Sequence, residues 1–97
     1  MLNSIDRIHR HTIKGEDAFF DDELIQTWVL YHLQILGEAA RSMSDDFRQQ
    51  HPEINWKGII DFRNFAVHEY FRIDLDLVWR IVTSDLPILQ KQLQDIP

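Results

Sequence analysis

The stretch LIQTWVLYHLQILGEAA, residues 24–40, decides the fold class of this chain. Apolar side chains recur in it at intervals of three and four, which is the period of an α-helix. An aspartate at position 21 or 22 can cap the helix. The apolar face is wide enough to pack against two neighbours, with a stripe of Leu24, Trp28, Tyr31, Ile35 and Ala39 flanked by Ile25, Val29, Leu36 and Ala40. This stretch is predicted to be the central helix of a bundle.

Gly37 stands in the middle of that helix. Glycine costs helix stability relative to alanine. Because it has no side chain, we expect its use to be the close approach of another backbone.

Further helices are predicted on both sides, and no alternating run suggests a sheet. Gly15 should end the first helix, Asn55 should cap the helix that leads into residues 63–70, and Asp74 or Asp76 should open the last helix, which Pro87 should kink or divide. The expected segments are 2–12, 44–50, 55–65 and 74–93. The predicted fold is all-α, an antiparallel bundle of four to five helices in one domain, residues 1–97.

Composition narrows the class of protein. The chain has 10 basic and 16 acidic residues, a net charge of −6, and no cysteine. The acidic charge repels phosphate backbones at long range, which counts against a tight nonspecific nucleic-acid binder but less against an enzyme that meets a nucleic acid as a transient substrate in a local cleft. Without a signal peptide or a long apolar run, we expect a cytoplasmic protein that spans no membrane.

The five histidines do not predict a metal site. His68 and Glu69 begin a zinc-type motif, but Arg72 stands where the second histidine ligand should be. His9 and His11 are two apart and face different sides of a helix, so we expect them at the surface. His32 is expected to be a core or interface histidine whose hydrogen bonds are satisfied. No metal and no cofactor is predicted.

Arg63, Asn64, His68 and Tyr70 remain as candidate site residues. An imidazole can take the proton of a ribose 2′-hydroxyl or give one to the leaving oxygen, while a guanidinium stabilises charge on the phosphorane. This chemistry needs no metal. One imidazole, however, is poorly suited to act as both base and acid in one step.

Helix geometry limits how Arg63 and His68 can meet. At about 100° per residue, the two side chains would point about 140° apart on a continuous helix. Either the helix ends after Arg63 and the chain bends back, or residues of two copies meet at a twofold axis. A purely structural alternative also stands, in which Arg63 pairs with an acidic neighbour, Phe65, Val67 and Tyr70 fill the core, and His68 caps a helix end.

The run from Arg63 to Tyr70 resembles the Arg-x4-6-His motif of HEPN-domain ribonucleases in its Arg-x4-His-x-Tyr form. Other segments resemble the HepT-like branch, once called DUF86, and the likeness extends from about residue 25 to residue 93. These segments are Leu36-Gly37-Glu38-Ala39-Ala40, His51-Pro52-Glu53-Ile54 with Trp56, Phe71-x-Ile73-Asp74, Val78-Trp79 and Asp85-Leu86-Pro87.

The resemblance implies a metal-independent RNase toxin that acts as a homodimer, with Arg63 and His68 catalytic, Asn64 supporting and the motif residues at the dimer cleft. It also implies an antitoxin partner, a minimal nucleotidyltransferase (MNT), that silences the toxin by adenylylating Tyr70. The sequence departs from the family in two places. Its first helix begins later than is common, so part of that packing is expected to be missing or the start to be internal, and Arg72 replaces a small residue.

Two rival functions stay open at the level of sequence. A noncatalytic helical dimer could hold and regulate a nucleotidyltransferase partner, which the acidic charge suits. Alternatively, the partner could be the toxin and this chain its antidote.

Overall fold

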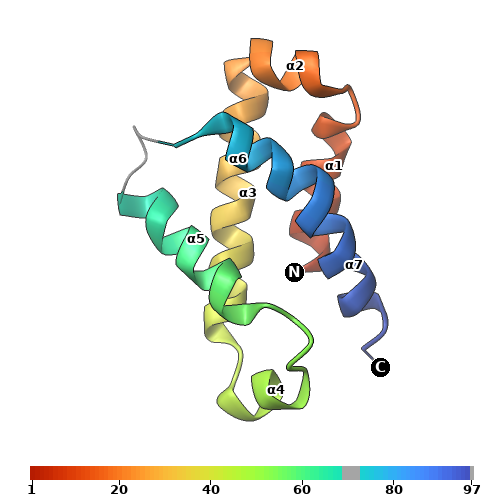
Figure 1. Cartoon of the computed structure of the whole chain (residues 1–97), viewed down its shortest axis with the longest axis vertical. Helices are drawn as coiled ribbons and strands as arrows, with labels where there is room; N and C mark the ends of the chain where they lie inside the picture. The colour runs from red at the N-terminus through yellow and green to blue at the C-terminus, as the bar shows by residue number, and fades with distance from the viewer. Residues whose placement is uncertain (69–72, 97) are drawn as a thin grey trace.

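The computed structural model describes residues 1–68 and 73–96, and it is all-helical over those residues. The helices follow one another with short connections (Figure 1), and the bounds agree with the predicted segments to within a few residues. The elements are α1 (Leu2–Thr12), α2 (Glu16–Asp21), α3 (Glu23–Ser42), α4 (Asp45–Gln50), α5 (Trp56–His68), α6 (Leu75–Arg80), the π-helical turn η2 (Ile81–Asp85) and α7 (Leu86–Gln94).

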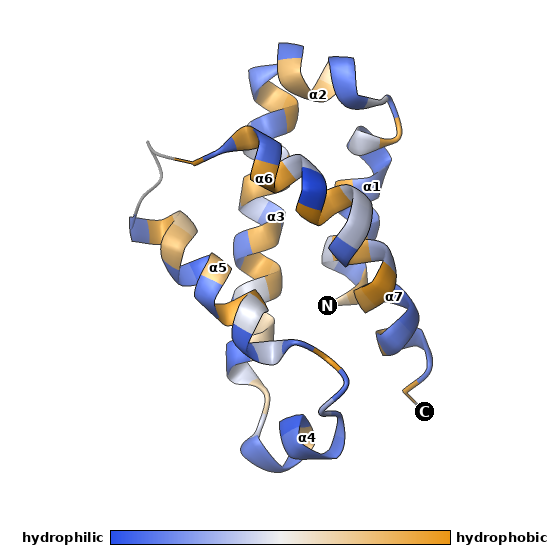
Figure 2. Ribbon diagram, viewed as in Figure 1, coloured by the Kyte–Doolittle hydropathy of each residue, from blue (hydrophilic) through white to orange (hydrophobic). Residues whose placement is uncertain are grey.

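The 20-residue helix α3 is the centre of the fold, as residues 24–40 predicted. Helices α1, α2 and α5 all pack against it, and α7 packs on α1. Figure 1 shows α5 running alongside α3 in the opposite direction. The largest fully buried side chains come from four different helices, so one core joins them; they are Ile8, Phe19, Val29 and Val78. Figure 2 shows hydrophobic residues on α1, α3, α5 and α7, whereas α4 is mostly hydrophilic.

Side-chain caps begin several helices where the sequence predicted them. The carboxylate of Asp22 accepts from Leu24 N, and that of Asp74 accepts from Asp76 N, both at 2.9 Å. The amide oxygen of Asn55 accepts from Gly58 N at 3.0 Å. Each contact satisfies a backbone N–H that the first helical turn leaves without a partner. Asp21 is not such a cap, because it ends α2.

The prediction that the apolar stripe of α3 faces the core was wrong in part. Leu24 is 81% exposed, Tyr31 is 58% exposed and Ile35 lies at the surface. The flanking set, with Leu30, Leu33 and His32, faces the interior instead. The reason is that α3 is apolar around most of its circumference, so periodicity alone does not tell which side has neighbours. We call Leu24, Trp28, Tyr31 and Ile35 the outer stripe of α3.

The structure also corrects two of the predicted segments, the one before α3 and the last helix. Helix α2 was not predicted, yet its Phe19 is fully buried. The last helix is divided, as Pro87 led us to expect, but the break is the π-helical turn η2 just before the proline. There Leu86 N donates to Ile81 O, a bond across five residues instead of four. Widening the turn accommodates a proline ring that would otherwise clash one turn back. In the described residues, no helix is long and apolar enough to cross a membrane.

Candidate active site

Gly37 fixes the contact between α3 and α5. A Cβ atom placed on Gly37 would lie 2.2 Å from Cβ of Arg63 and 3.2 Å from the carbonyl oxygen of Ile59. Both distances are shorter than ordinary van der Waals contact. The predicted close approach at Gly37 is therefore confirmed, and the neighbour that approaches is the α5 backbone at Arg63.

Arg63 is held by an ion pair and a hydrogen bond. Its Nη2 lies 2.9 Å from Oε2 of Glu38 on α3, and its Nη1 donates to Oδ1 of Asn64 at 2.9 Å. The Arg63 side chain is only 22% exposed, whereas that of Glu38 is 55% exposed. The guanidinium thus lies beneath a solvent-accessible carboxylate, with a defined orientation. An ion pair this exposed adds little to stability, about 0–1 kcal/mol.

His68 does not reach Arg63 through a bend in the chain. Helix α5 continues through His68, so the alternative in which the helix ends after Arg63 was wrong. On one helix the two side chains point about 140° apart. His68 is exposed at the end of α5. One copy of the chain therefore presents Arg63 and His68 on different sides of the same helix.

The remaining site predictions have mixed outcomes. Asn64 contacts Arg63, whereas Tyr70 lies outside the described residues. The structural alternative had Arg63 paired with an acidic residue, and Glu38 is that residue. The same alternative placed Phe65 and Val67 in the core, but they are 41% and 44% exposed. In residues 1–68 and 73–96, no cluster of three or more His, Asp or Glu side chains could hold a metal ion.

His32 is buried, as expected, on the side of α3 that faces α1. The expectation that its ring is satisfied was wrong, because neither ring nitrogen has a hydrogen-bond partner among the described residues. Its ring lies against Trp28 at 4.4 Å and Tyr31 at 5.1 Å between centroids, and the ring of His11, half-buried instead of at the surface, continues the row on Trp28 at 5.0 Å. Burial, followed by the charges of Arg7 and His11, lowers the pKa of His32 below 6.5.

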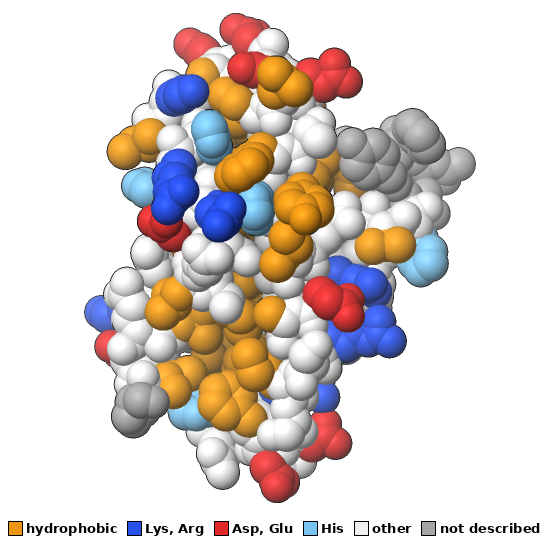
Figure 3. All heavy atoms as spheres, turned by 180° about the vertical axis from the view of Figure 1, so that it is seen from behind, with side chains coloured by type: hydrophobic (Ala, Val, Ile, Leu, Met, Phe, Trp, Pro, Cys, Tyr) orange, Lys and Arg blue, Asp and Glu red, His pale blue; other side chains and the backbone are white. Residues whose placement is uncertain are grey.

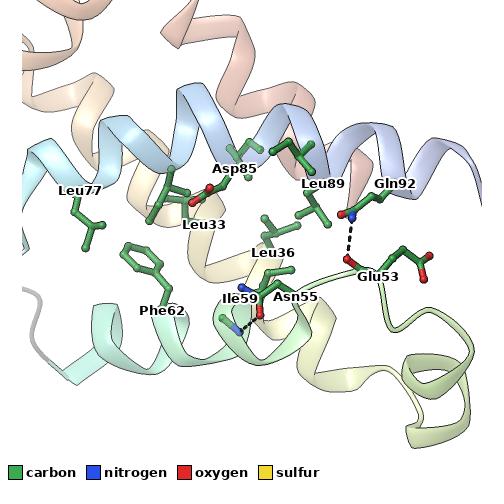
Figure 4. A pocket seen from close by; sticks show the side chains of 14 residues that line it. Leu33, Leu36, Glu53, Asn55, Ile59, Phe62, Leu77, Asp85, Leu89 and Gln92 are labelled. Carbon is green, nitrogen blue, oxygen red and sulfur yellow. Dashed lines mark hydrogen bonds between the residues drawn. The ribbon is translucent and has the colours of Figure 1, made fainter.

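An apolar groove of about 440 Å³ lies between α5 and the α6–η2–α7 stretch, with Leu33 and Leu36 of α3 at its base (Figure 4). Phe62 points into it, but Arg63, Asn64 and His68 do not line it. The charged side chains that line it in the described part of the chain, Glu53 and Asp85, are both acidic. Since carboxylates repel phosphates, the groove does not suit an RNA backbone.

Comparison with known proteins shows to which family this chain belongs. The model of the ribonuclease HepT-like family matches residues 1–96. The chain belongs to the ribonuclease HepT-like family. The resemblance inferred from the Arg63–Tyr70 run and the segments around it is thereby confirmed.

Individual relatives agree with the family match. A provisionally named RNase of Methanocaldococcus jannaschii is 38% identical over 80% of this chain and 72% of its own length. A protein of Thermococcus cleftensis named "Probable ribonuclease HepT" is 33% identical over 82% of this chain and 73% of its own. A longer M. jannaschii protein, named as both a gamma-glutamylcyclotransferase and a provisional RNase, is 34% identical over 99% of this chain but only 44% of its own length. No solved structure matches significantly.

The sequence did not reveal that Glu38 is the partner of Arg63. Glu38 was noticed only as part of a family segment, and no role was given to it. The signal was its position next to Gly37, since a residue beside a point of close helix approach lies near whatever the neighbouring helix presents there.

Proposed function

We propose that this chain is the RNA endonuclease toxin of a toxin–antitoxin pair and works as a homodimer. Arg63 and His68 are the catalytic residues and Asn64 supports Arg63. The RNA 2′-hydroxyl attacks the adjacent phosphate without a metal, which leaves a cyclic phosphate end. The observation that carries the proposal is the preformed Arg63 guanidinium in a member of a ribonuclease family, held at 2.9 Å by Glu38 and Asn64. A guanidinium fixed in this way suits a developing phosphorane charge.

A second copy would supply the histidine that one copy cannot bring to Arg63. Three residues of the outer stripe, Leu24, Tyr31 and Ile35, are exposed, whereas Trp28 is half-buried. Glu38 continues the stripe, because positions 24, 28, 31, 35 and 38 follow intervals of four and three. Figure 3 shows exposed apolar side chains on this face of the molecule, with basic and histidine side chains beside them. An isologous contact through the stripe would bury these apolar groups next to Arg63.

The rise of a helix predicts where the twofold axis crosses α3. Arg63 lies at the level of Gly37, and His68 lies about 7.5 Å further along α5, toward the amino end of α3. Along the axis of α3, His68 therefore lies beside about residue 32. If two copies of α3 pack antiparallel, Arg63 of the first copy lies beside His68 of the second when the twofold axis crosses α3 midway between residues 32 and 37, near Ile35.

Oxidative cross-linking tests the position of this axis. The chain has no cysteine, so Ile35→Cys introduces a single thiol that would face its own copy across the axis. We expect a disulfide-linked dimer under mild oxidation, seen on a non-reducing gel, because a disulfide needs Cα atoms within about 7 Å. Leu24→Cys, on the same stripe but three turns away, is the control and should stay monomeric on the gel. Equal cross-linking of both variants would contradict an axis near Ile35.

The proposed silencing partner is a minimal nucleotidyltransferase that adenylylates Tyr70. Tyr70 follows His68 by two positions in the sequence, so a nucleotide attached there would add bulk and negative charge beside the RNA cleft. Mass spectrometry of the protein co-expressed with a candidate minimal nucleotidyltransferase would detect the modification.

Cleavage of single-stranded RNA by the unmodified protein tests the proposed activity. We expect cleavage in the presence of a chelator, with Arg63→Ala and His68→Ala each slowing it at least about a hundredfold, since each removes a group that acts in the transition state. Asp6→Asn, which breaks an exposed ion pair with Arg10 on α1, is the control and should cut at the parent rate. Parent protein that cuts no RNA, or His68→Ala that cuts as fast as the parent, would show the proposed function to be wrong.

A further inference from the structure

The proposed reaction needs two proton transfers, and His68 can efficiently perform only one of them. A base must remove the proton from the 2′-hydroxyl, and an acid must protonate the departing 5′-oxygen. Among the described residues, Glu38 is the titratable side chain that the structure joins to Arg63. Its carboxylate lies in the same chain and on the same contact as the phosphate-binding guanidinium.

Arg63 can hold a phosphate and Glu38 at the same time. A guanidinium has five N–H donors; one of them donates to Asn64, and Nη2 forms an ion pair with the Glu38 carboxylate. The donors that are left can bind the non-bridging oxygens of a phosphate on the solvent side. Because the Glu38 side chain is more than half exposed while Arg63 lies beneath it, a phosphate bound there would have its ribose beside the carboxylate.

We propose that Glu38 is the general base of the reaction, an inference that rests on the proposed ribonuclease function. The Glu38 carboxylate takes the proton of the 2′-hydroxyl as the 2′-oxygen forms its bond to phosphorus. The bond from phosphorus to the 5′-oxygen breaks, and protonated His68 of the second copy gives its proton to that oxygen. The products are a 2′,3′-cyclic phosphate and a 5′-hydroxyl. Glu38 then gives its proton to water, and His68 takes up a proton from water, so both residues return to their starting states.

The Glu38→Gln variant distinguishes a general base from a residue that only positions Arg63. Glu38→Gln keeps the size of the side chain and an oxygen that can accept from Arg63, but it removes the ability to take a proton. If Glu38 only orients Arg63, this variant should keep most of its kcat, and RNA should bind as well or better because one negative charge is gone. If Glu38 is the base, kcat should fall by about a hundredfold or more while KM changes little.

The experiment separates the base from the acid through the leaving group. A pool of labelled single-stranded RNA 20-mers first locates one cleavage site, and an oligonucleotide with sulfur in place of the bridging 5′-oxygen is then made for that site. A thiolate leaves without needing a proton. On this substrate His68→Ala should recover at least tenfold relative to its defect on RNA, whereas the defect of Glu38→Gln should stay unchanged. Glu38→Asp should retain part of kcat, and Asp6→Asn should match the parent on both substrates.

A Glu38→Gln variant that keeps the parent kcat, or one that recovers on the sulfur substrate as His68→Ala does, overturns the role of Glu38 and leaves the ribonuclease function standing. A parent that cuts no RNA overturns both.

Discussion

Replacing Gly37 by alanine is expected to lower the midpoint of thermal unfolding by roughly 5–15 °C and to slow RNA cleavage by about a hundredfold. The added methyl group would meet Cβ of Arg63 at 2.2 Å and the backbone oxygen of Ile59 at 3.2 Å. Neither atom belongs to the far end of a flexible side chain, so α3 and α5 must move apart. Overpacking of this kind costs about 1–3 kcal/mol, and the better helix propensity of alanine offsets up to about 1 kcal/mol.

The effect on cleavage follows from the same contact. Arg63 is oriented by Glu38 across the α3–α5 junction, so a separation of about 1 Å between the helices would misplace the guanidinium relative to the phosphate. Calorimetry or circular dichroism measures the unfolding midpoint, and cleavage is measured well below it. A variant that unfolds at the parent temperature and cuts RNA at the parent rate would contradict this description of the junction.

Gly58→Ala is the matched control on α5. There the nearest atoms to an added Cβ belong to the side-chain amide of Asn55, the closest at 2.4 Å, and they can swing away. The change costs at most the cap that Asn55 makes to Gly58 N, about 1 kcal/mol, and the gain in helix propensity offsets most of it. We expect this variant to unfold within a few degrees of the parent.

Much of the fold could be predicted because local rules dominate it. The 3.6-residue period located α3, and the capping residues Asp22, Asn55 and Asp74 act where expected. Helix α2 was missed because six residues between Gly15 and Asp22 are too few to show a period. The core side of α3 was misassigned because Leu24, Tyr31 and Ile35 are as apolar as the residues that do face neighbours, and only the tertiary contacts decide between them.

The candidate site could be predicted only in part for a related reason. Arg63, Asn64 and His68 lie in one sequence run, so their chemistry could be recognised together. Glu38 belongs to another helix, and its contact with Arg63 depends on how α3 and α5 pack. Because α5 continues through His68, helix geometry places Arg63 and His68 on different sides of the helix. A site that uses both residues therefore needs two copies of the chain.

Recovery of activity in a mixed dimer tests the central claim most directly. Arg63→Ala and His68→Ala chains, carrying different affinity tags, are co-expressed, and the heterodimer is isolated by both tags in turn. If each site combines Arg63 of one copy with His68 of the other, the heterodimer has one intact site out of two and should cut RNA at about half the parent rate. Each variant alone should be at least about a hundredfold slower than the parent. A heterodimer as inactive as the two variants alone would contradict a site shared between two copies.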